Sequence, residues 1–296
     1  MNLRKKLSGL VEDTSYKNIK FYNLEENINE LETYGFTIIP PEKVANKDFL
    51  KKMRAKILQL CKERTGEQFY LKRNGKHGHY KAEPQTDNQF LLYYLLMEGP
   101  LFEEWLMNPI LNSLVDYLMK GNQQLSSMTS FVKWQGDGYG ETLGLHSDTP
   151  PNTAEGLLPT AWSDVCNATY CLTDYTLDNG ALAIVPGSHR FARQPKFGEG
   201  IKRAIPVEAK AGSLIAWHGN VWHGAFPKET EGLRLNLTTY FCHKKLKTQE
   251  AYQWRVTEEM IKRNPPGFAK LVAADDPMGW DEHGPNYARG IEYKNK

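Results

Sequence analysis

The β-rich character of the chain is clearest in GSLIAWHGNVWHGAFPKETEGLRLNLTTYF, residues 212–241 of 296. Apolar, aromatic and β-branched residues form a run at each end of this stretch, and turn-forming residues separate the two runs. Working outward, three earlier runs have the same character: SMTSFVKW (127–134), NATYCLTDY (167–175) and ALAIVP (181–186). Short strands at this spacing are typical of a sandwich or barrel. We therefore expect a mainly β core at about 125–243, with helices added at both ends.

Helical patterns precede this core. From Lys47 to Arg64, apolar residues recur at steps of three and four, and Gly66 provides a stop signal. Further helices are expected at Leu101–Met107 and Pro109–Lys120, where proline suits the first helical position. The run from Asn88 to Met97, which contains FLLYYLLM, predicts a buried helix because it is apolar all round and too short to span a membrane.

No internal repeat, low-complexity linker or sharp composition break divides the sequence. A single domain over residues 1–296 is therefore expected. It would have a helical N-terminal part at about 20–124, the β core, and a helical C-terminal extension at about 247–296.

The composition is that of an ordinary globular protein. Lys and Arg total 37 against 35 Asp and Glu, so the formal net charge of +2 gives no general attraction to nucleic acid or to anionic membranes. The chain has four cysteines without CxxC spacing, and acidic residues interrupt the N-terminus before any signal-like apolar run. We expect a cytoplasmic protein with reduced thiols that binds neither nucleic acid nor membranes.

The chemistry is expected at the segment GLHSDTPP, which holds His146 and Asp148 two residues apart. In a strand, residues i and i+2 point to the same face, so an imidazole and a carboxylate can converge there. His218 or His223 could supply a third ligand, and two histidines with one carboxylate suit a non-haem Fe(II) oxygenase. The alternative is that H-x-D is a surface turn with no metal.

Arg234 lies eleven residues after His223 and is flanked by strand-like leucines. A buried arginine is costly without an anionic partner. Either it pairs with a core carboxylate, or its planar guanidinium binds the carboxylate of a small diacid beside the metal.

With these residues in view, the sequence resembles the phytanoyl-CoA dioxygenase-like family of Fe(II)/2-oxoglutarate oxygenases. The resemblance covers about 120 residues. Its motifs, in order, are H-S-D at 146–148, LTDYTLDNGALAIVPGSH at 172–189, GSLIAWHGNVWHGAF at 212–226 and GLRLNLTTYF at 232–241.

This resemblance implies a double-stranded β-helix (jelly-roll) core and the cofactors Fe(II), 2-oxoglutarate and O2. It implies that His146, Asp148 and His223 bind the iron and that Arg234 binds the C5 carboxylate of 2-oxoglutarate. His218 corresponds to a family histidine that is usually not a ligand, so a structural role is expected for it.

Two positions depart from the family pattern. Ala225 stands where many members have a Ser or Thr that helps to hold the C5 carboxylate, and Ser147 replaces a frequent Gln between the proximal ligands. Asp148 is retained, whereas halogenating relatives have Gly or Ala there, so halogenation is not expected.

Strand alternation adds further candidates. Asn167 and Thr169 share one face of their strand, and the resemblance places them near 2-oxoglutarate; the alternative is a solvent-facing surface. Thr129 and Phe131 alternate in the same way and are predicted to contact cosubstrate and substrate respectively, while the role of Lys133 stays open. Trp162, in a connection between motif strands, is a candidate substrate contact.

Hydroxylation of an unactivated C–H bond in a small organic molecule is the predicted reaction, with succinate and CO2 as coproducts. Desaturation, epoxidation or cyclisation could follow from the same oxidant. One alternative is a cupin-like isomerase or dioxygenase that does not use 2-oxoglutarate, and another is a non-catalytic binding module. The basic segment 71–84 is interpreted as a solvated loop or as a lid over the site. Substrate identity and oligomeric state are not encoded in these motifs.

Overall fold

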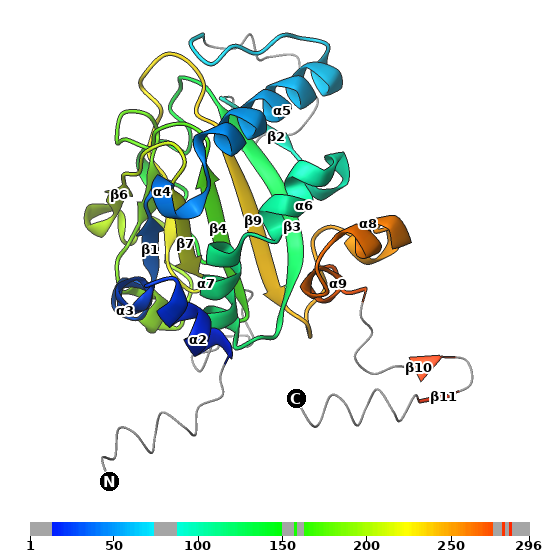
Figure 1. Ribbon diagram of the computed structural model, residues 1–296. Helices are drawn as coiled ribbons and strands as arrows, with labels where there is room; N and C mark the ends of the chain where they lie inside the picture. The colour runs from blue at the N-terminus through cyan, green and yellow to red at the C-terminus, as the bar shows by residue number, and fades with distance from the viewer. Residues whose placement is uncertain are drawn as a thin grey trace.

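A six-stranded antiparallel sheet forms the centre of the computed structural model, which describes residues 14–73, 88–149, 157–158, 163–274, 280–281 and 284–285 (Figure 1). Its strands lie in the order β1 (Phe36–Ile39), β7 (Leu214–His218), β4 (Val165–Cys171), β9 (Asn236–His243), β3 (Gln123–Lys133) and β2 (Gln89–Leu92). A second sheet contains β6 (Ile205–Val207), β5 (Leu182–Ile184) and β8 (His223–Ala225). A two-residue pair, β10 (Trp280–Asp281) with β11 (Gly284–Pro285), lies near the C-terminus.

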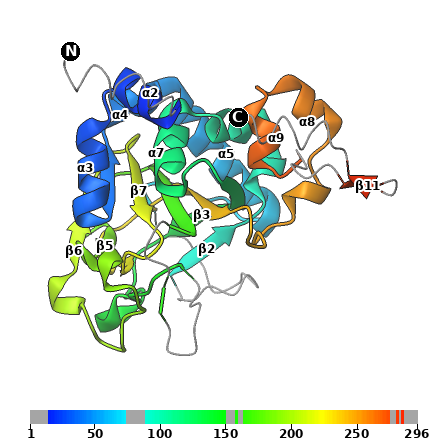
Figure 2. The same cartoon turned by 90° about the horizontal axis from the view of Figure 1, so that it is seen from below.

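Helices cover one face of the large sheet, and the small sheet lies beyond its other face (Figure 2). The helices are α2 (Thr14–Phe21), α3 (Glu25–Tyr34), α4 (Pro41–Val44), α5 (Lys47–Thr65), α6 (Pro100–Leu106), α7 (Pro109–Met119), α8 (Glu258–Arg263) and α9 (Gly267–Leu271). Short 3-10 turns complete the chain: η1 (Leu95–Glu98), η2 (Gly140–Thr142), η3 (Ser188–Phe191), η4 (Ile201–Arg203) and η5 (Tyr252–Trp254).

Alternation along the strands divides the core into two parts. On the helix-covered face, Tyr170 of β4 stacks on Trp105 of α6 with 4.5 Å between ring centroids. On the opposite face, Ile215 and Trp217 of β7 pack with Ile184 of the small sheet. The space between the two sheets is therefore lined by one side-chain parity of each strand, and the functional candidates belong to that parity.

Several predicted elements are present with nearly the predicted bounds. The helix predicted from Lys47 is α5, and Gly66 caps it in the left-handed conformation with φ of 77°. The predictions at 101–107 and 109–120 correspond to α6 and α7, and Pro109 occupies the first turn of α7 after the side-chain cap of Asn108. The five β-rich runs correspond to β3, β4, β5, β7 and β9.

The predicted helix from Asn88 to Met97 is wrong. Residues 89–92 form β2, which pairs with β3, and residues 95–98 form η1. The run is apolar all round because both sides of β2 are covered: Phe90 and Leu92 join the helix-side core, while Leu91 lines the space between the sheets. Periodicity cannot separate a strand covered on both faces from a buried helix.

The prediction that the β core begins only at about residue 125 is also wrong. Strands β1 and β2 come from the part expected to be helical, and they form the two edges of the large sheet. The segment Phe36–Ile39 is only four residues long and pairs with β7, 181 residues later at Phe36↔Trp217. A sequence pattern of four residues does not reveal pairing with a distant strand, so β1 was not predicted.

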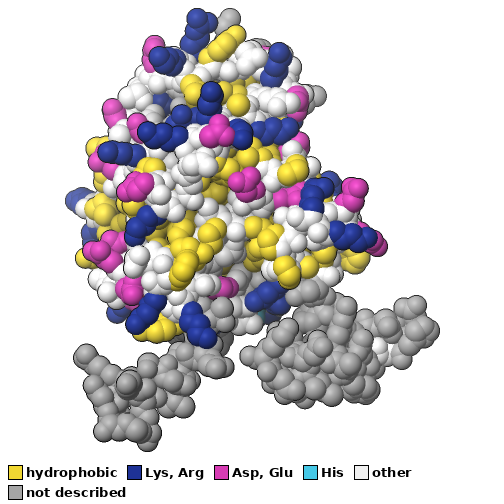
Figure 3. Space-filling model, in the orientation of Figure 1, with side chains coloured by type: hydrophobic (Ala, Val, Ile, Leu, Met, Phe, Trp, Pro, Cys, Tyr) yellow, Lys and Arg dark blue, Asp and Glu magenta, His cyan; other side chains and the backbone are white. Residues whose placement is uncertain are grey.

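The surface and the thiols agree with the composition. Basic and acidic side chains are interspersed over the face shown in Figure 3. All four cysteines are buried and unpaired, as expected. None of the helices in the described part of the chain has the length and apolarity needed to cross a bilayer.

Candidate active site

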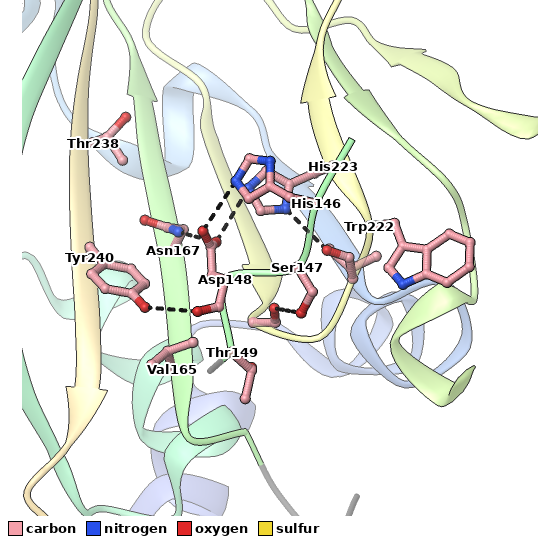
Figure 4. Close-up of polar contacts among 12 residues, drawn as sticks. His146, Ser147, Asp148, Thr149, Val165, Asn167, Trp222, His223, Thr238 and Tyr240 are labelled. Atoms are coloured by element: carbon pink, nitrogen blue, oxygen red, sulfur yellow. Dashed lines mark hydrogen bonds and ion pairs between the residues drawn. The ribbon is translucent and has the colours of Figure 1, made fainter. Parts of the chain in front are cut away.

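A pair of backbone hydrogen bonds brings the two predicted histidine ligands together. The amide of His146 donates to the carbonyl of His223, and the amide of His223 donates to the carbonyl of His146, both at 2.9 Å. Asp148 follows two residues later, and its carboxylate lies 3.5 Å from Nε2 of His146 and 3.3 Å from Nε2 of His223 (Figure 4). One potential ligand atom from each residue lies within 4.8 Å of the others.

Backbone carbonyls orient both imidazole rings. Nδ1 of His146 lies 2.8 Å from the carbonyl oxygen of Gly144, and Nδ1 of His223 lies 3.0 Å from that of Val221. Because a carbonyl only accepts, Nδ1 carries the proton in each ring and Nε2 keeps its lone pair for a ligand. This arrangement suits a divalent transition metal.

The electrostatics of the cluster favour an ionised carboxylate. Burial raises the pKa of Asp148, but His223, His146 and the amide of Asn167 outweigh burial and lower this pKa to about 2. Burial also lowers the pKa of His223. For His146, burial lowers the pKa, but the nearby Asp148 carboxylate and the Gly144 carbonyl outweigh burial and raise it. An anionic oxygen with two imidazoles is a donor set that fits Fe(II) and leaves coordination positions open.

A second layer of contacts fixes the segment that carries these ligands. The side-chain amide of Gln194 accepts from the backbone amide of Ser147 and donates to its carbonyl, both at 2.8 Å. The Ser147 hydroxyl donates to the carbonyl of Gly219 at 2.9 Å, so this side chain points away from the cluster. Asn167 donates to the Asp148 carboxylate at 2.6 Å.

A cavity of about 380 Å³ extends from this cluster between the sheets. The predicted residues Thr129, Phe131, Asn167 and Thr169 all line it, which excludes the solvent-facing alternative for Asn167 and Thr169. The Thr169 hydroxyl lies 2.8 Å from the hydroxyl of Thr238 on the neighbouring strand. The site and the cavity thus form one continuous space.

Two buried cations line the far end of this cavity. Arg234 is 4% exposed, donates to the carbonyl of Gly180 at 2.8 Å and lies over the ring of Tyr175. Its Nε is buried without a hydrogen-bond partner among the described residues. Lys133 is 3% exposed and lies over the ring of Tyr139.

No described acidic side chain forms an ion pair with either cation. Burial and the nearby charge of Arg234 hold the pKa of Lys133 well below its usual value. The core-carboxylate alternative for Arg234 is therefore wrong within the described residues. Two buried, unneutralised cations fit a carboxylate-bearing ligand.

The remaining sequence candidates lie elsewhere. Trp162 and residues 74–84 of the proposed lid lie outside the described residues. His218 is not part of the three-residue cluster; its Nδ1 accepts from the amide of Asn220, and burial lowers its pKa to about 3. Ala225 lines the cavity without offering a hydroxyl.

Other cavity residues were not among the predicted contacts. On β9, Asn236, Thr238 and Tyr240 have the parity of the cavity face, and the alternation rule used for β4 would have identified them. Leu91 and Tyr93 were missed because their segment was interpreted as a helix. Gln249 follows β9 and carries no sequence signal of its own.

Comparison with known proteins agrees with these observations. The family model described as phytanoyl-CoA dioxygenase matches residues 31–236. The dioxygenase af480 of Aspergillus fumigatus is 25% identical over 62% of this chain, and a phytanoyl-CoA dioxygenase of Arabidopsis thaliana is 30% identical over 53% of it. The chain matches 58% of the length of each of these two relatives.

Solved structures of the same fold also match. HygX from Streptomyces hygroscopicus, solved with nickel, 2-oxoglutarate and hygromycin B, has a TM-score of 0.55 and 16% identity over 76% of this chain and 89% of HygX. The carbocyclase SnoK from nogalamycin biosynthesis has a TM-score of 0.56 and 16% identity over 79% of this chain and 90% of SnoK. At this identity the likeness shows the jelly-roll fold, as predicted.

Proposed function

The chain belongs to the phytanoyl-CoA dioxygenase family, and from this premise we propose that it is an Fe(II)/2-oxoglutarate-dependent oxygenase. Its proposed reaction is hydroxylation of an unactivated C–H bond in a small organic molecule, with one atom of O2 entering the product and the other entering succinate. The observation that carries the proposal is a single cavity with an open His-Asp-His cluster at one end and two buried, unneutralised cations at the other.

His146, Asp148 and His223 are the proposed iron ligands. When bound, Fe(II) with 2-oxoglutarate and O2 supplies the oxidative decarboxylation to succinate and CO2 and the oxidant for the C–H bond. The Gly144 and Val221 carbonyls hold the two imidazole donors in position. Asn167 fixes the rotation of the Asp148 carboxylate by its hydrogen bond.

Arg234 is the proposed partner of the C5 carboxylate of 2-oxoglutarate, and Lys133 is the proposed second cation. Together they compensate for the missing hydroxyl at Ala225, because Arg234 is already desolvated and an anion beside Lys133 favours its protonated form. Thr129 and Thr169 are the proposed polar contacts between the two ends. This need for an anion argues against the cupin-like alternative, which uses no 2-oxoglutarate.

The substrate end of the cavity is the wall formed by Phe131 and its neighbours. Burial and the nearby Asp148 charge raise the pKa of Tyr240, whose hydroxyl donates to the Asp148 carbonyl at 3.4 Å, so this phenol keeps its proton during turnover.

We propose that the chain works as one domain in the cytoplasm, supported by the two sheets enclosing one cavity and by four unpaired buried thiols.

Binding of 2-oxoglutarate and its analogues tests the proposed roles of the two cations and of the keto group. Calorimetry on the Fe(II)-loaded protein under nitrogen would compare 2-oxoglutarate with 2-oxobutyrate, which lacks the distal carboxylate, and with glutarate, which lacks the keto group. The proposal predicts that both analogues bind much more weakly than 2-oxoglutarate. Equal binding of 2-oxobutyrate would remove the role of Arg234 and Lys133, and equal binding of glutarate would remove chelation by the keto acid.

A further inference from the structure

The mouth of the cavity is uncharged among the described residues. Tyr93 after β2, Ser127 of β3, Tyr240 of β9 and Gln249 line the cavity here, and Tyr93 and Gln249 are exposed, so this part opens to solvent. Lys133 lies six residues from Ser127 along β3 and pairs with Arg234, so the positive charges lie away from this part of the cavity. A charged substrate group at the mouth would find no counter-charge there, whereas a neutral polar group would find hydrogen-bonding side chains.

Strand register places this mouth across the sheet from the proposed metal site. Asn167, which donates to Asp148, pairs with Tyr240, and Tyr240 pairs with Ser127. Neighbouring strands lie about 4.8 Å apart, so Asn167 and Ser127 are separated by about 10 Å. A small molecule of about two rings can bridge that distance.

A β-bulge fixes Gln249 at this position. The register of β3 and β9 shifts between Leu125 and Ser127, which leaves Ser126 as the extra residue. Its hydroxyl accepts from the backbone amide of Gln249 at 3.0 Å, and its carbonyl accepts from the amide of Glu250 at 2.8 Å. The polar groups of the bulge thus anchor the segment that follows β9.

The buried carboxylate of Glu250 ties the parts of the mouth together. It accepts from the amide of Tyr94 at 2.7 Å and from the amide of Met128 at 3.0 Å. Tyr94 is adjacent to Tyr93, Met128 is adjacent to Ser127, and Glu250 is adjacent to Gln249. Tyr93, Ser127 and Gln249 are therefore each next to a residue that carries this carboxylate or donates to it.

One hydrogen bond orients the exposed side chain of Gln249. The Ser127 hydroxyl donates to its Oε1 at 2.6 Å, so the side-chain oxygen is engaged. The Nε2 group has no hydrogen-bond partner among the described residues, and the side chain lines the cavity. Two N–H donors are consequently available to an acceptor oxygen.

We propose that Gln249 is a specificity-determining residue that donates a hydrogen bond to a neutral acceptor oxygen of the substrate, such as a ketone. The proposal rests on the proposed function, because it requires the reacting C–H bond to lie about 10 Å away at the metal site. Gln249, Ser127 and Tyr93 form the subsite, and Glu250 positions them.

Four probes with one skeleton test this subsite: 4-phenylcyclohexanone, phenylcyclohexane, 4-phenylcyclohexylamine and 4-phenylcyclohexanecarboxylate. Calorimetry under nitrogen on the protein loaded with Fe(II) and 2-oxoglutarate gives their dissociation constants. The ketone is expected to bind tightest. One neutral hydrogen bond corresponds to about a threefold to tenfold change in affinity.

The matched variants are Gln249→Met, Gln249→Glu and, as a remote control, Gln59→Met on the exposed side of α5. Gln249→Met is expected to reduce ketone preference about threefold to tenfold, and Gln249→Glu to shift the preference to the amine. Gln59→Met is expected to keep the wild-type order. Unfolding temperatures check that each variant is folded.

A ketone that binds no tighter than the hydrocarbon, or whose advantage survives in Gln249→Met, would overturn the subsite. Binding of 2-oxoglutarate to the Fe(II) protein is measured first in the same sample. Its failure would count against the proposed function, whereas success there with unchanged probe preferences counts against Gln249 alone.

Discussion

At the scale of single residues, the site depends on which ring nitrogen each histidine presents. His223 and His218 are five residues apart, yet only His223 directs Nε2 toward Asp148, because its Nδ1 lies against the Val221 carbonyl. His218 uses Nδ1 to accept a backbone hydrogen bond and lies outside the cluster. The H-x₄-H spacing could not distinguish the two histidines, since the difference arises from the turn between them.

Replacing these two histidines makes a matched test. His223→Ala is expected to weaken Fe(II) binding by at least about a hundredfold, because it removes a ligand rather than a supporting contact. His218→Ala is expected to retain Fe(II) binding. Equilibrium titration with Fe(II) under nitrogen measures both, and strong binding by His223→Ala would remove it from the metal site.

Arg234 allows an independent test at the opposite end of the cavity. Arg234→Ala leaves a desolvated anion short of its partner, which costs about 2–4 kcal/mol of binding free energy. The KM for 2-oxoglutarate should therefore rise roughly thirtyfold or more, with little change in Fe(II) affinity. Lys52→Ala, which removes an exposed partner of Asp48 on α5, serves as the control. An unaltered KM in Arg234→Ala would contradict the carboxylate assignment.

At the scale of elements, the site depends on close contact between β8 and the segment before His146. The amide of Ala225 donates to the carbonyl of Leu143 at 2.9 Å, and Gly224 lies between this contact and His223. A Cβ on Gly224 would lie 2.0 Å from the Leu143 oxygen, so only glycine allows the two backbones to approach. This glycine was recognised in the sequence only as part of a motif.

Gly224→Ala should therefore separate the two histidine-bearing strands. Overpacking of this kind costs about 1–3 kcal/mol of unfolding free energy, and we expect a loss of Fe(II) affinity as well. Gly267→Ala is the control, because its Cβ would meet only Met107 at 3.6 Å, an ordinary contact. Denaturant unfolding and Fe(II) titration provide the two readouts; unchanged values in Gly224→Ala would show that the strands can separate without consequence.

Glu250, in the segment after β9, is expected to make the stability of the folded protein depend on pH. Burial raises the pKa of Glu250 above its ordinary value of 4.5. As pH rises above 4.5, the unfolded chain loses this proton before the folded protein does, so wild-type stability falls as the pH passes through the raised pKa.

Glu250→Gln should remove this slope while keeping an acceptor for the backbone amides. The exposed Glu42→Gln is expected to keep the wild-type slope. Denaturant unfolding of all three proteins across this pH interval measures the effect. A slope that persists in Glu250→Gln would assign it to another group.

The elements also show what could be predicted from the sequence. His146, Asp148 and Arg234 could be singled out from short motifs, and the resemblance to a known family selected His223 over His218 as the proposed third ligand. Strands β1 and β2 could not be predicted, because their identity depends on pairing with β7 and β3 far along the chain. Gln249 could not be predicted because the bulge at Ser126, rather than its own neighbours, brings it to the cavity.

At the scale of the whole molecule, function conflicts with stability in the part of the cavity lined by Lys133 and Arg234. Lys133 is desolvated without a described acidic partner, and its charge is opposed by Arg234. Such a pair destabilises the ligand-free protein unless an anion lies between them. The jelly roll can hold them because two sheets and the helices bury a large core around the cavity.

Lys133→Met should consequently stabilise the ligand-free protein, by about 1–3 kcal/mol, since an apolar side chain of similar length replaces a buried charge. The same variant should lose most of the rise in unfolding temperature that 2-oxoglutarate produces in the Fe(II)-loaded wild type. Thermal unfolding with and without 2-oxoglutarate measures both effects. A destabilised variant with an undiminished ligand response would contradict a cationic role for Lys133.

The central claim is that one cavity holds a keto acid between the His-Asp-His cluster and the two buried cations. Anaerobic titration of the Fe(II)-loaded protein with 2-oxoglutarate, followed by visible absorption, tests it most directly. We predict that the weak metal-to-ligand charge-transfer band of a keto-acid chelate will develop and saturate at one equivalent of 2-oxoglutarate per chain. Bound iron with no such band at saturating 2-oxoglutarate would contradict the claim.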